Sequence, residues 1–202
     1  MKIISHRRNT LQELQATPET YGIEVDIRSH GDRLIIHHDP FADGEVFETW
    51  LDHYKHGTLI LNVKEEGLEA RLVALMQERG ISDFFFLDQS FPFLVKWSKL
   101  GERRCAVRVS EFESIATAMT LAGKVDWVWV DCFTRFPLSR AEARTLQAAG
   151  FKLCLVSPEL QGRDATTEIP AMIQLLAERQ IIADAVCTKR AEMWGPAVTA
   201  GS

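Results

Sequence analysis

Short apolar runs and longer amphipathic stretches alternate along most of the chain. Short apolar runs bounded by turn residues are typical of buried strands, and apolar residues spaced three and four apart predict helices. The predicted strands cover residues 3–5, 23–27, 34–36, 58–64, 84–87, 104–109, 127–130, 152–156 and 185–187. The predicted helices cover residues 11–17, 45–55, 68–79, 91–100, 111–122, 139–149 and 168–179.

This alternation predicts an α/β fold in which helices cover a parallel sheet. About eight strands are each followed by a segment that can cross back, which favours a (β/α)₈ TIM barrel. Such a barrel needs at least ~200 residues, so a single domain over residues 1–202 would be of near-minimal length. A doubly wound open sheet is the alternative. Its nucleotide-binding signals, G-x-G-x-x-G after the first strand and G-x-x-x-x-G-K-[ST], are absent from the sequence.

One stretch, from Gly22 to Pro40, departs from the strand–helix alternation. Residues 29–32 have the composition of a turn, and the apolar run at 34–36 leads the chain back toward His37 and His38. We therefore expect a β-hairpin after the second strand of the barrel.

Composition and charge narrow the classes of partner. Hydrophobic residues make up 46% of the chain and charged residues 25%, which is ordinary for a folded globular protein. The formal net charge of −5 argues against non-specific binding to nucleic acid or acidic lipid. No apolar run approaches the length of a membrane span, and no signal peptide is recognisable, so a cytoplasmic location is expected. The cysteines show no metal-binding spacing and are expected to be buried free thiols: Cys105, Cys132, Cys154 and Cys187.

Active sites of (β/α)₈ barrels lie at the carboxyl ends of the strands. Polar residues end nearly every predicted strand here, and a purely structural protein would gain nothing by burying them. These residues are His6, Arg7, Glu24, Asp26, Asn62, Lys64, Asp88, Arg108, Asp131, Ser157 and Thr188. A barrel enzyme of another chemistry would use Asp88 and Asp131 as acid and base, although ordinary strand-end caps occupy the same positions.

Glu24 and Asp26 lie two residues apart on a predicted strand whose alternate residues are apolar. Strand periodicity points both carboxylates out of the same face. Two such carboxylates can bind an oxygen-preferring cation, Mg²⁺ or Ca²⁺. A solvent-facing strand edge is the other interpretation, and the histidines that end the hairpin argue against it. Asn62 and Lys64 repeat the same spacing on a later strand.

Two imidazoles are expected to approach these carboxylates. His6 ends the first strand, and the hairpin brings back His37 and His38, of which one can face the pocket because successive residues alternate. Imidazoles titrate near neutral pH and suit proton transfer. Together with Arg7, Lys64 and a cation that polarises a phosphoryl oxygen, they predict cleavage of a phosphodiester.

These residues resemble the motifs of the glycerophosphodiester phosphodiesterases, within the wider phospholipase-C-like phosphodiesterase barrels. The matching segments are 6–7 (His-Arg), 9–10 (Asn-Thr), 23–26 (Ile-Glu-x-Asp), 38–40 (His-Asp-Pro), 62–64 (x-x-Lys), 90–91 (Ser-Phe) and 183–188 (Ala-Asp-x-x-x-Thr). The resemblance therefore spans nearly the whole chain. Its N-terminal motifs are specific in combination, and the later ones are weak.

The resemblance implies an enzyme, a phosphoric diester hydrolase acting on a glycerophosphodiester or a related small phosphodiester of lipid metabolism. It implies Mg²⁺ or Ca²⁺ as the cofactor and favours His38 over His37. The implied roles are acid–base catalysis for His6 and His38, phosphate binding for Arg7 and Lys64, and metal binding for Glu24, Asp26 and Asn62.

Three features depart from the family pattern. Arg8 stands where the family usually has a glycine after His-Arg, and the insertion that commonly shapes the substrate pocket is reduced to about residues 43–57. Asn62 stands at the third metal-binding carboxylate, so the site has one negative charge fewer. The alternative hypothesis is therefore a degenerate barrel of the same family, which binds a phosphate-bearing ligand without turnover.

Overall fold

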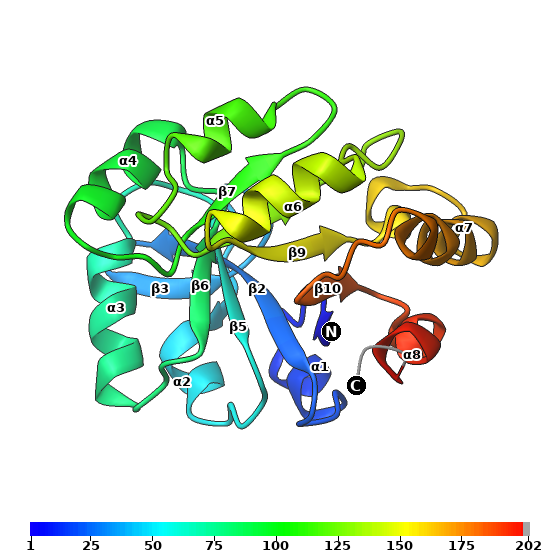
Figure 1. Ribbon diagram of the computed structural model, residues 1–202. Coiled ribbons are helices and arrows are strands. Elements are labelled where there is room, and N and C mark those ends of the chain that lie inside the picture. Colours follow the sequence, from blue (N-terminus) through cyan, green and yellow to red (C-terminus); the bar gives the residue numbers. More distant parts are fainter. Residues whose placement is uncertain (200–202) are drawn as a thin grey trace. The chain divides into compact units, whose positions relative to one another are not determined.

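A computed structural model describes residues 1–199, with side chains described as far as residue 195 (Figure 1). The chain forms two compact units. The N-terminal unit is Ser5–Leu94, and the C-terminal unit joins Met1–Ile4 to Val95–Ser202. Each unit is built from strands and helices that alternate along the chain, as an α/β fold requires.

The sheet of the N-terminal unit contains β2 (Gly22–His30), β3 (Arg33–Ile36), β4 (Glu45–Val46), β5 (Leu59–Val63) and β6 (Phe84–Leu87). β5 lies between β2 and β6 and runs parallel to both (Figure 1). β3 runs antiparallel to β2, and β4 runs antiparallel to β3. All residues of β5 and β6 are buried, and all except Asn62 are apolar, which explains why neither strand alternates between polar and apolar residues.

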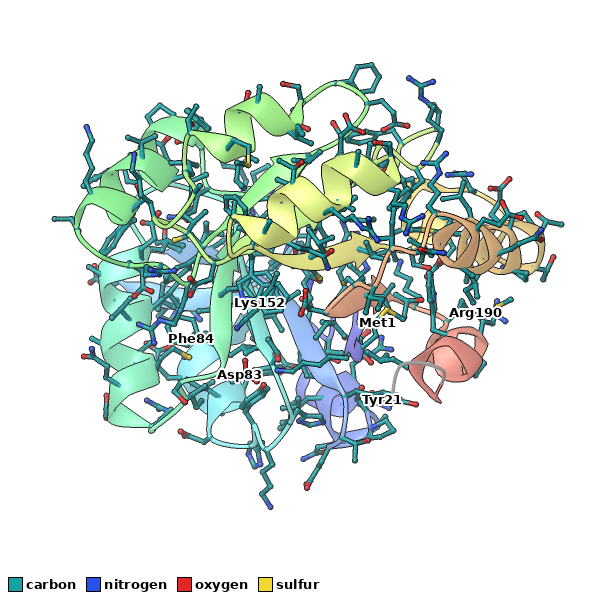
Figure 2. The ribbon with its side chains drawn as sticks, in the orientation of Figure 1. Met1, Tyr21, Asp83, Phe84, Lys152 and Arg190 are labelled. Atoms are coloured by element: carbon teal, nitrogen blue, oxygen red, sulfur yellow. The ribbon has the colours of Figure 1, made fainter. Side chains whose placement is uncertain are left out.

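The helices of this unit are α1 (Leu11–Gln15), α2 (Phe47–Leu51) and α3 (Glu69–Glu78). α1 begins at a capping box, in which the Thr10 hydroxyl accepts from the backbone N–H of Glu13 and the Glu13 carboxylate accepts from that of Thr10. Figure 2 labels Tyr21 and Asp83, which precede β2 and β6 and mark the amino ends of these strands. The carboxyl ends lie at the opposite edge of the sheet.

The C-terminal unit contains a second run of parallel strands. They are β1 (Lys2–Ser5, whose last residue belongs to the N-terminal unit), β7 (Ala106–Val109), β8 (Trp127–Val130), β9 (Lys152–Val156) and β10 (Ala185–Thr188). Their order is β7-β8-β9-β10-β1. The connecting helices are α5 (Ile115–Met119), α6 (Arg140–Ala148), the 3₁₀-helix η1 (Pro158–Gln161), α7 (Ala165–Glu178) and α8 (Ala191–Thr199), while α4 (Phe91–Lys99) joins the two units in sequence.

Several element boundaries differ from the sequence predictions. β2 extends to His30, because His30 pairs with Arg33 and only two residues form the turn. The helix predicted over 111–122 is reduced to α5, because the Ser110 hydroxyl and the Glu113 carboxylate close a turn before it. The segment predicted as a helix over 45–55 is β4 followed by α2, and η1 and α8 were not predicted.

The predicted burial of the four cysteines is confirmed. Trp127 and Trp129 are buried in β8, and the cysteines are buried and form no disulfide among residues 1–199. No helix in the described part of the chain combines the length and the hydropathy needed to cross a bilayer. A closed barrel, and a single domain over residues 1–202, stay predictions.

Candidate functional site

The strand register of the N-terminal unit brings the predicted polar residues to one edge of its sheet. Asp26 on β2 is directly opposite Asn62 on β5, and Asn62 is opposite Leu87, the residue before Asp88. Glu24 and Asp26 share one face of β2 because side chains alternate along a strand. The side chains of both acids are almost completely buried.

The turn after β1 is wrapped against these two carboxylates. Arg7 has a positive φ of 50°, a conformation that costs a non-glycine residue about 1 kcal/mol. In this conformation its backbone N–H donates to Glu24 Oε2 at 2.8 Å, and its guanidinium Nε lies 3.4 Å from Asp26 Oδ2. His6 Nε2 lies 3.7 Å from Glu24 Oε2. One strained residue thus places an imidazole and a guanidinium beside both acids.

Further hydrogen bonds hold this turn in place. The Asn9 side chain donates to Asp26 Oδ2 at 2.8 Å, and its Oδ1 accepts from the Asp26 backbone N–H at 3.1 Å. The backbone N–H of Arg8 donates to the carbonyl of Glu24 at 3.0 Å. The indole of Trp50, which is buried, donates to the carbonyl of Arg8 at 3.1 Å. Arg8 is therefore held through its backbone, and its guanidinium also donates to Thr17 Oγ1 at 3.0 Å.

Lys64 forms ion pairs with an acid of β2 and with the acid that follows β6. Its Nζ lies 3.1 Å from Asp26 Oδ1 and 3.3 Å from Asp88 Oδ2. The Lys64 side chain is only 14% exposed, whereas that of Asp88 is 26% exposed. Lys64 and Asp88 also line a cavity of about 280 Å³ together with Glu66 and Ser90. Lys64 therefore borders a space large enough for a small ligand.

The surroundings of Glu24 strongly affect its protonation. Burial and the neighbouring charge of Asp26 raise its pKa to about 7, against the hydrogen bonds from Arg7 and Asn62 and the charge of Lys64. The Asn62 amide Nδ2 donates to Glu24 Oε1 at 2.9 Å. A buried carboxylate with a pKa near neutrality is a common mark of a functional site, since added positive charge would stabilise its ionised form.

The oxygens around Glu24 fit a hard cation. Asn62 Oδ1 is buried, and among the described residues no donor reaches it. It joins the carboxylate oxygens of Glu24 and Asp26 in an all-oxygen set, of the kind that Mg²⁺ and Ca²⁺ prefer. Within residues 1–199, no three His, Cys, Asp or Glu side chains are placed to share a metal ion. The site therefore has two carboxylates and one amide as candidate ligands.

His38 lies on the segment that follows β3. The backbone N–H of His37 donates to the Asp26 carbonyl at 3.0 Å, which places the start of this segment beside β2. The His38 ring is 43% exposed, and its Nδ1 lies 2.8 Å from Asp39 Oδ1. The hydrogen bond with His38 lowers the pKa of Asp39, and the charge of Arg7 contributes to the same shift. Asp39 thus holds Nδ1 and leaves Nε2 of His38 for another partner.

The structure brings together most of the residues that the sequence singled out. His6, Arg7, Glu24, Asp26, Asn62 and Lys64 form one connected group. The His38 ring makes no hydrogen bond to this group among the described residues, and its ring hydrogen bond goes to Asp39. The roles of these residues stay predictions. Sequence reasoning missed the contacts of Asn9 and Asp39, whose neighbouring motifs were the available signal.

Comparison with solved structures identifies the fold. A glycerophosphodiester phosphodiesterase from Agrobacterium tumefaciens str. C58 matches with a TM-score of 0.65 and 16% sequence identity, over 98% of this chain and 99% of that chain. Two structures of mutant tryptophan synthase alpha-subunits from Pyrococcus furiosus match with TM-scores of 0.56 and 0.55 and identities of 12% and 13%. Both matches cover 96% of this chain and 90% of the other.

The chain has the TIM-barrel-like fold of these proteins. No protein-family model and no curated protein matches it. Identities of 12% to 16% show the fold alone, and the names of the matched proteins point to different chemistries. The function must therefore be argued from the residues of the site.

Proposed function

We propose that this protein is a phosphodiesterase, a metal-dependent hydrolase of a glycerophosphodiester or a related small phosphodiester. The observation that carries the proposal is the connected group on β2, at the carboxyl end of β5 and in the turn after β1. It places two buried acids, Glu24 and Asp26, within 4 Å of an imidazole, a guanidinium and an ammonium group. The similarity in fold to a glycerophosphodiester phosphodiesterase supports the same reaction class.

Arg7 and Lys64 would bind the phosphate. Both carry fixed positive charge beside Asp26, and Lys64 also lines a cavity of about 280 Å³. Cations held in place before the substrate arrives stabilise charge that develops on the phosphoryl oxygens. Arginine is suited to this task because its planar guanidinium can donate two parallel hydrogen bonds to a phosphate.

His6 and His38 would transfer the protons. In the hydrolysis, a water oxygen forms a bond to phosphorus, the bond from phosphorus to the leaving alcohol breaks, and a phosphomonoester and an alcohol result. One imidazole accepts the proton of the water, and the other donates a proton to the leaving oxygen. The contact of His38 Nδ1 with Asp39 supports this role, because it fixes the tautomer and leaves Nε2 available.

Oxygens of Glu24, Asp26 and Asn62 would hold the cation, Mg²⁺ or Ca²⁺. When bound, a divalent cation polarises a phosphoryl oxygen and lowers the pKa of the attacking oxygen. The buried Asn62 Oδ1 and the raised pKa of Glu24 support such a site. The finer parts of the proposal are a closed (β/α)₈ barrel with a hairpin after its second strand, a cytoplasmic location and a role in lipid metabolism.

Phosphorus-31 NMR on a panel of diesters, including glycerophosphocholine, glycerophosphoethanolamine and bis(p-nitrophenyl) phosphate, tests this proposal. We expect hydrolysis that a chelator abolishes and that added Mg²⁺ or Ca²⁺ restores. His6→Ala and His38→Ala should each reduce the rate by at least about 100-fold while the circular dichroism spectrum is retained. His53→Ala is the matched control, because His53 is exposed in the same unit and should keep the wild-type rate. A wild-type rate in either site variant would contradict the proposal.

Asn62 favours one second candidate, a barrel that binds a phosphate-bearing ligand without hydrolysis. Asn62 is neutral, so the site has only two carboxylates to attract a metal ion. Arg7 and Lys64 already lie within 4 Å of Asp26 and supply positive charge that can bind a phosphate without a metal. Binding of inorganic phosphate without added metal, and no hydrolysis across the panel, would favour this candidate. Asn62→Glu separates the two, since only a weakened enzyme should gain rate from it.

A further inference from the structure

Arg28 is a charged residue of β2 that the proposed reaction does not use. It lies two residues after Asp26 and four after Glu24, so strand alternation places all three on the same face of β2. Its Nε and Nη2 donate to the carbonyl oxygen of His38 at 3.1 and 2.9 Å. Its Nη1 donates to the carbonyl oxygen of Lys64 at 3.3 Å. One guanidinium therefore bridges two backbone positions 26 residues apart in sequence (38 and 64).

The partners of Arg28 are unusual for a partly buried arginine. Among residues 1–195 no carboxylate lies within 4 Å of its guanidinium, and its hydrogen bonds all go to those two carbonyls. Arginines that are withdrawn from water are normally paired with acids, because an uncompensated charge is costly to desolvate. The contacts of Arg28 are therefore directed at the backbone of the two segments rather than at a neutralising partner.

Both segments carry a group of the proposed reaction. Among the described residues, the His38 ring is held only by its contact with Asp39; the ring is 43% exposed, and Asp39 is itself exposed. The backbone before it is fixed by one hydrogen bond, from His37 to Asp26. Lys64 is fixed on its N–H side by the Ile27 carbonyl at 3.0 Å, and on its carbonyl side by Arg28. The bridge is therefore a direct link between the two segments.

We propose that Arg28 is a positioning residue, which sets the separation between the imidazole of His38 and the ammonium group of Lys64 by clamping their backbone carbonyls. This inference rests on the proposed function. Proton transfer is sensitive to placement, and a displacement of about 1 Å can reduce a rate by about 100-fold. Two of the three hydrogen bonds go to His38, so the step served by His38 should be affected more than the binding of phosphate.

The experiment compares Arg28→Met and Arg28→Lys with the wild type and with Arg71→Met. Arg71 is the matched control because its guanidinium also donates to a backbone carbonyl of this unit, that of Asp32 at 2.7 Å, and also pairs with Glu48. We expect Arg28→Met to lower kcat by about 10- to 100-fold with KM changed by less than about threefold. Arg28→Lys can still donate to His38 and should regain part of kcat, and Arg71→Met should match the wild type.

A spectroscopic arm reads the position of His38 without turnover. In nitrogen-15 NMR spectra of the ring nitrogens, Arg28→Met should change the His38 signals that report its hydrogen bond with Asp39 and leave the His6 signals unchanged. Wild-type kcat together with unchanged His38 signals in Arg28→Met would overturn the proposal. Should Arg28→Met fail to fold, Arg28→Lys tests the proposal, because one ammonium group cannot reproduce the guanidinium bridge. Full activity and unchanged His38 signals in Arg28→Lys would equally overturn the proposal.

The two arms separate this proposal from the proposed function. If the wild type hydrolyses no diester, the proposed function fails, while the NMR arm still decides whether Arg28 positions His38. If the wild type is active and the variants of Arg28 behave as the wild type, the positioning role fails and the phosphodiesterase stands.

Discussion

The pKa values of Glu24 in the N-terminal unit and of Glu111 in the C-terminal unit are shifted in opposite directions. Burial and the charge of Asp26 raise the pKa of Glu24 to about 7. Burial also works against the charge of Glu111, but the backbone N–H groups of Thr134 and Arg135 outweigh it and lower the pKa of Glu111 to about 2. The ionised Glu111 carboxylate holds a loop through hydrogen bonds from its backbone. The ionised form of Glu24 is instead disfavoured by burial and by the charge of Asp26.

The strand-end aspartates differ in the same way. Asp131, after β8, accepts from the backbone N–H of Cys132 at 2.9 Å and from the Gln161 side chain at 2.7 Å, and lies 3.5 Å from Arg108. The first two of these partners are uncharged groups. Asp26 instead has two cations at 3.1 and 3.4 Å, from side chains that lie beside a second buried acid.

A polar residue at the end of a strand is therefore not by itself evidence of a functional site. Glu111 and Asp131 accept hydrogen bonds from nearby loop residues, which is a structural use. In the N-terminal unit like charges are held together against their mutual repulsion. Such an arrangement lowers stability, and proteins retain it where the site uses the charge.

The largest expected difference between the two units is in activity. Asp26→Asn removes a proposed metal ligand and should therefore lower kcat/KM by at least about 100-fold. It also removes the charged partner of Arg7 and Lys64, which should lower the free energy of unfolding by roughly 3 kcal/mol. Asp131→Asn should leave kcat/KM within about threefold and lower only stability. Steady-state kinetics and urea unfolding of both variants measure this. Equal losses of activity would remove the distinction between the units.

A smaller change in activity is expected from restoring a charge. Asn62→Glu adds a third carboxylate beside Glu24 and Asp26, and should increase the affinity for Mg²⁺ or Ca²⁺ by about tenfold or more, because hard-cation affinity rises with ligand charge. Isothermal titration calorimetry with each metal, followed by rate measurements, checks it. Unchanged affinity would mean that Asn62 does not face the cation.

Glu24→Gln should stabilise the protein at high pH. The folded-state pKa of Glu24 is raised above its ordinary value, so its ionisation costs stability as pH rises from about 4.5 to 7. The glutamine avoids that cost, and Asn62 can turn its amide to accept from it. Without metal, we expect a gain of roughly 1–3 kcal/mol at pH 8 that disappears near pH 5. Urea unfolding at both pH values measures it; a loss of stability at pH 8 would contradict this account.

Glu111→Gln should have the smallest effect and the opposite sign. The folded-state pKa of Glu111 is lowered, so its stabilising contribution is complete above about 4.5 and is lost as pH falls through about 2. We expect the variant to be less stable at pH 7 by about 1 kcal/mol or less. Thermal unfolding at pH 7 and pH 3 should show the difference shrinking in acid, and a difference that grows in acid would count against the assignment.

Local pattern was enough to place much of the candidate site. Alternation along β2 put Glu24 and Asp26 on one face, and the parallel register of β5 brought Asn62 and Lys64 beside them. Each of these inferences needs only the period of a strand and the rule that parallel strands end at one edge. The same period also places Arg28 on that face, although its role becomes visible only when its acceptors are known.

The remaining contacts depend on segments that are distant in sequence. In the Asn-Thr motif, Thr10 is the N-cap of α1, and the Asn9 amide donates to Asp26. That pairing requires the turn after β1 to lie against β2, which no local pattern specifies. The choice between His37 and His38 likewise depends on the path of a short loop rather than on periodicity.

A crystal structure of the protein with Ca²⁺ or Mg²⁺ and glycerol 3-phosphate tests the central claim most directly. The account predicts a cation bound by oxygens of Glu24, Asp26 and Asn62 at about 2.0–2.6 Å, with the phosphate on Arg7 and Lys64 and within reach of His6 and His38. A phosphate and a cation bound away from Glu24, Asp26 and Asn62, or a His38 ring directed away from the phosphate, would contradict it.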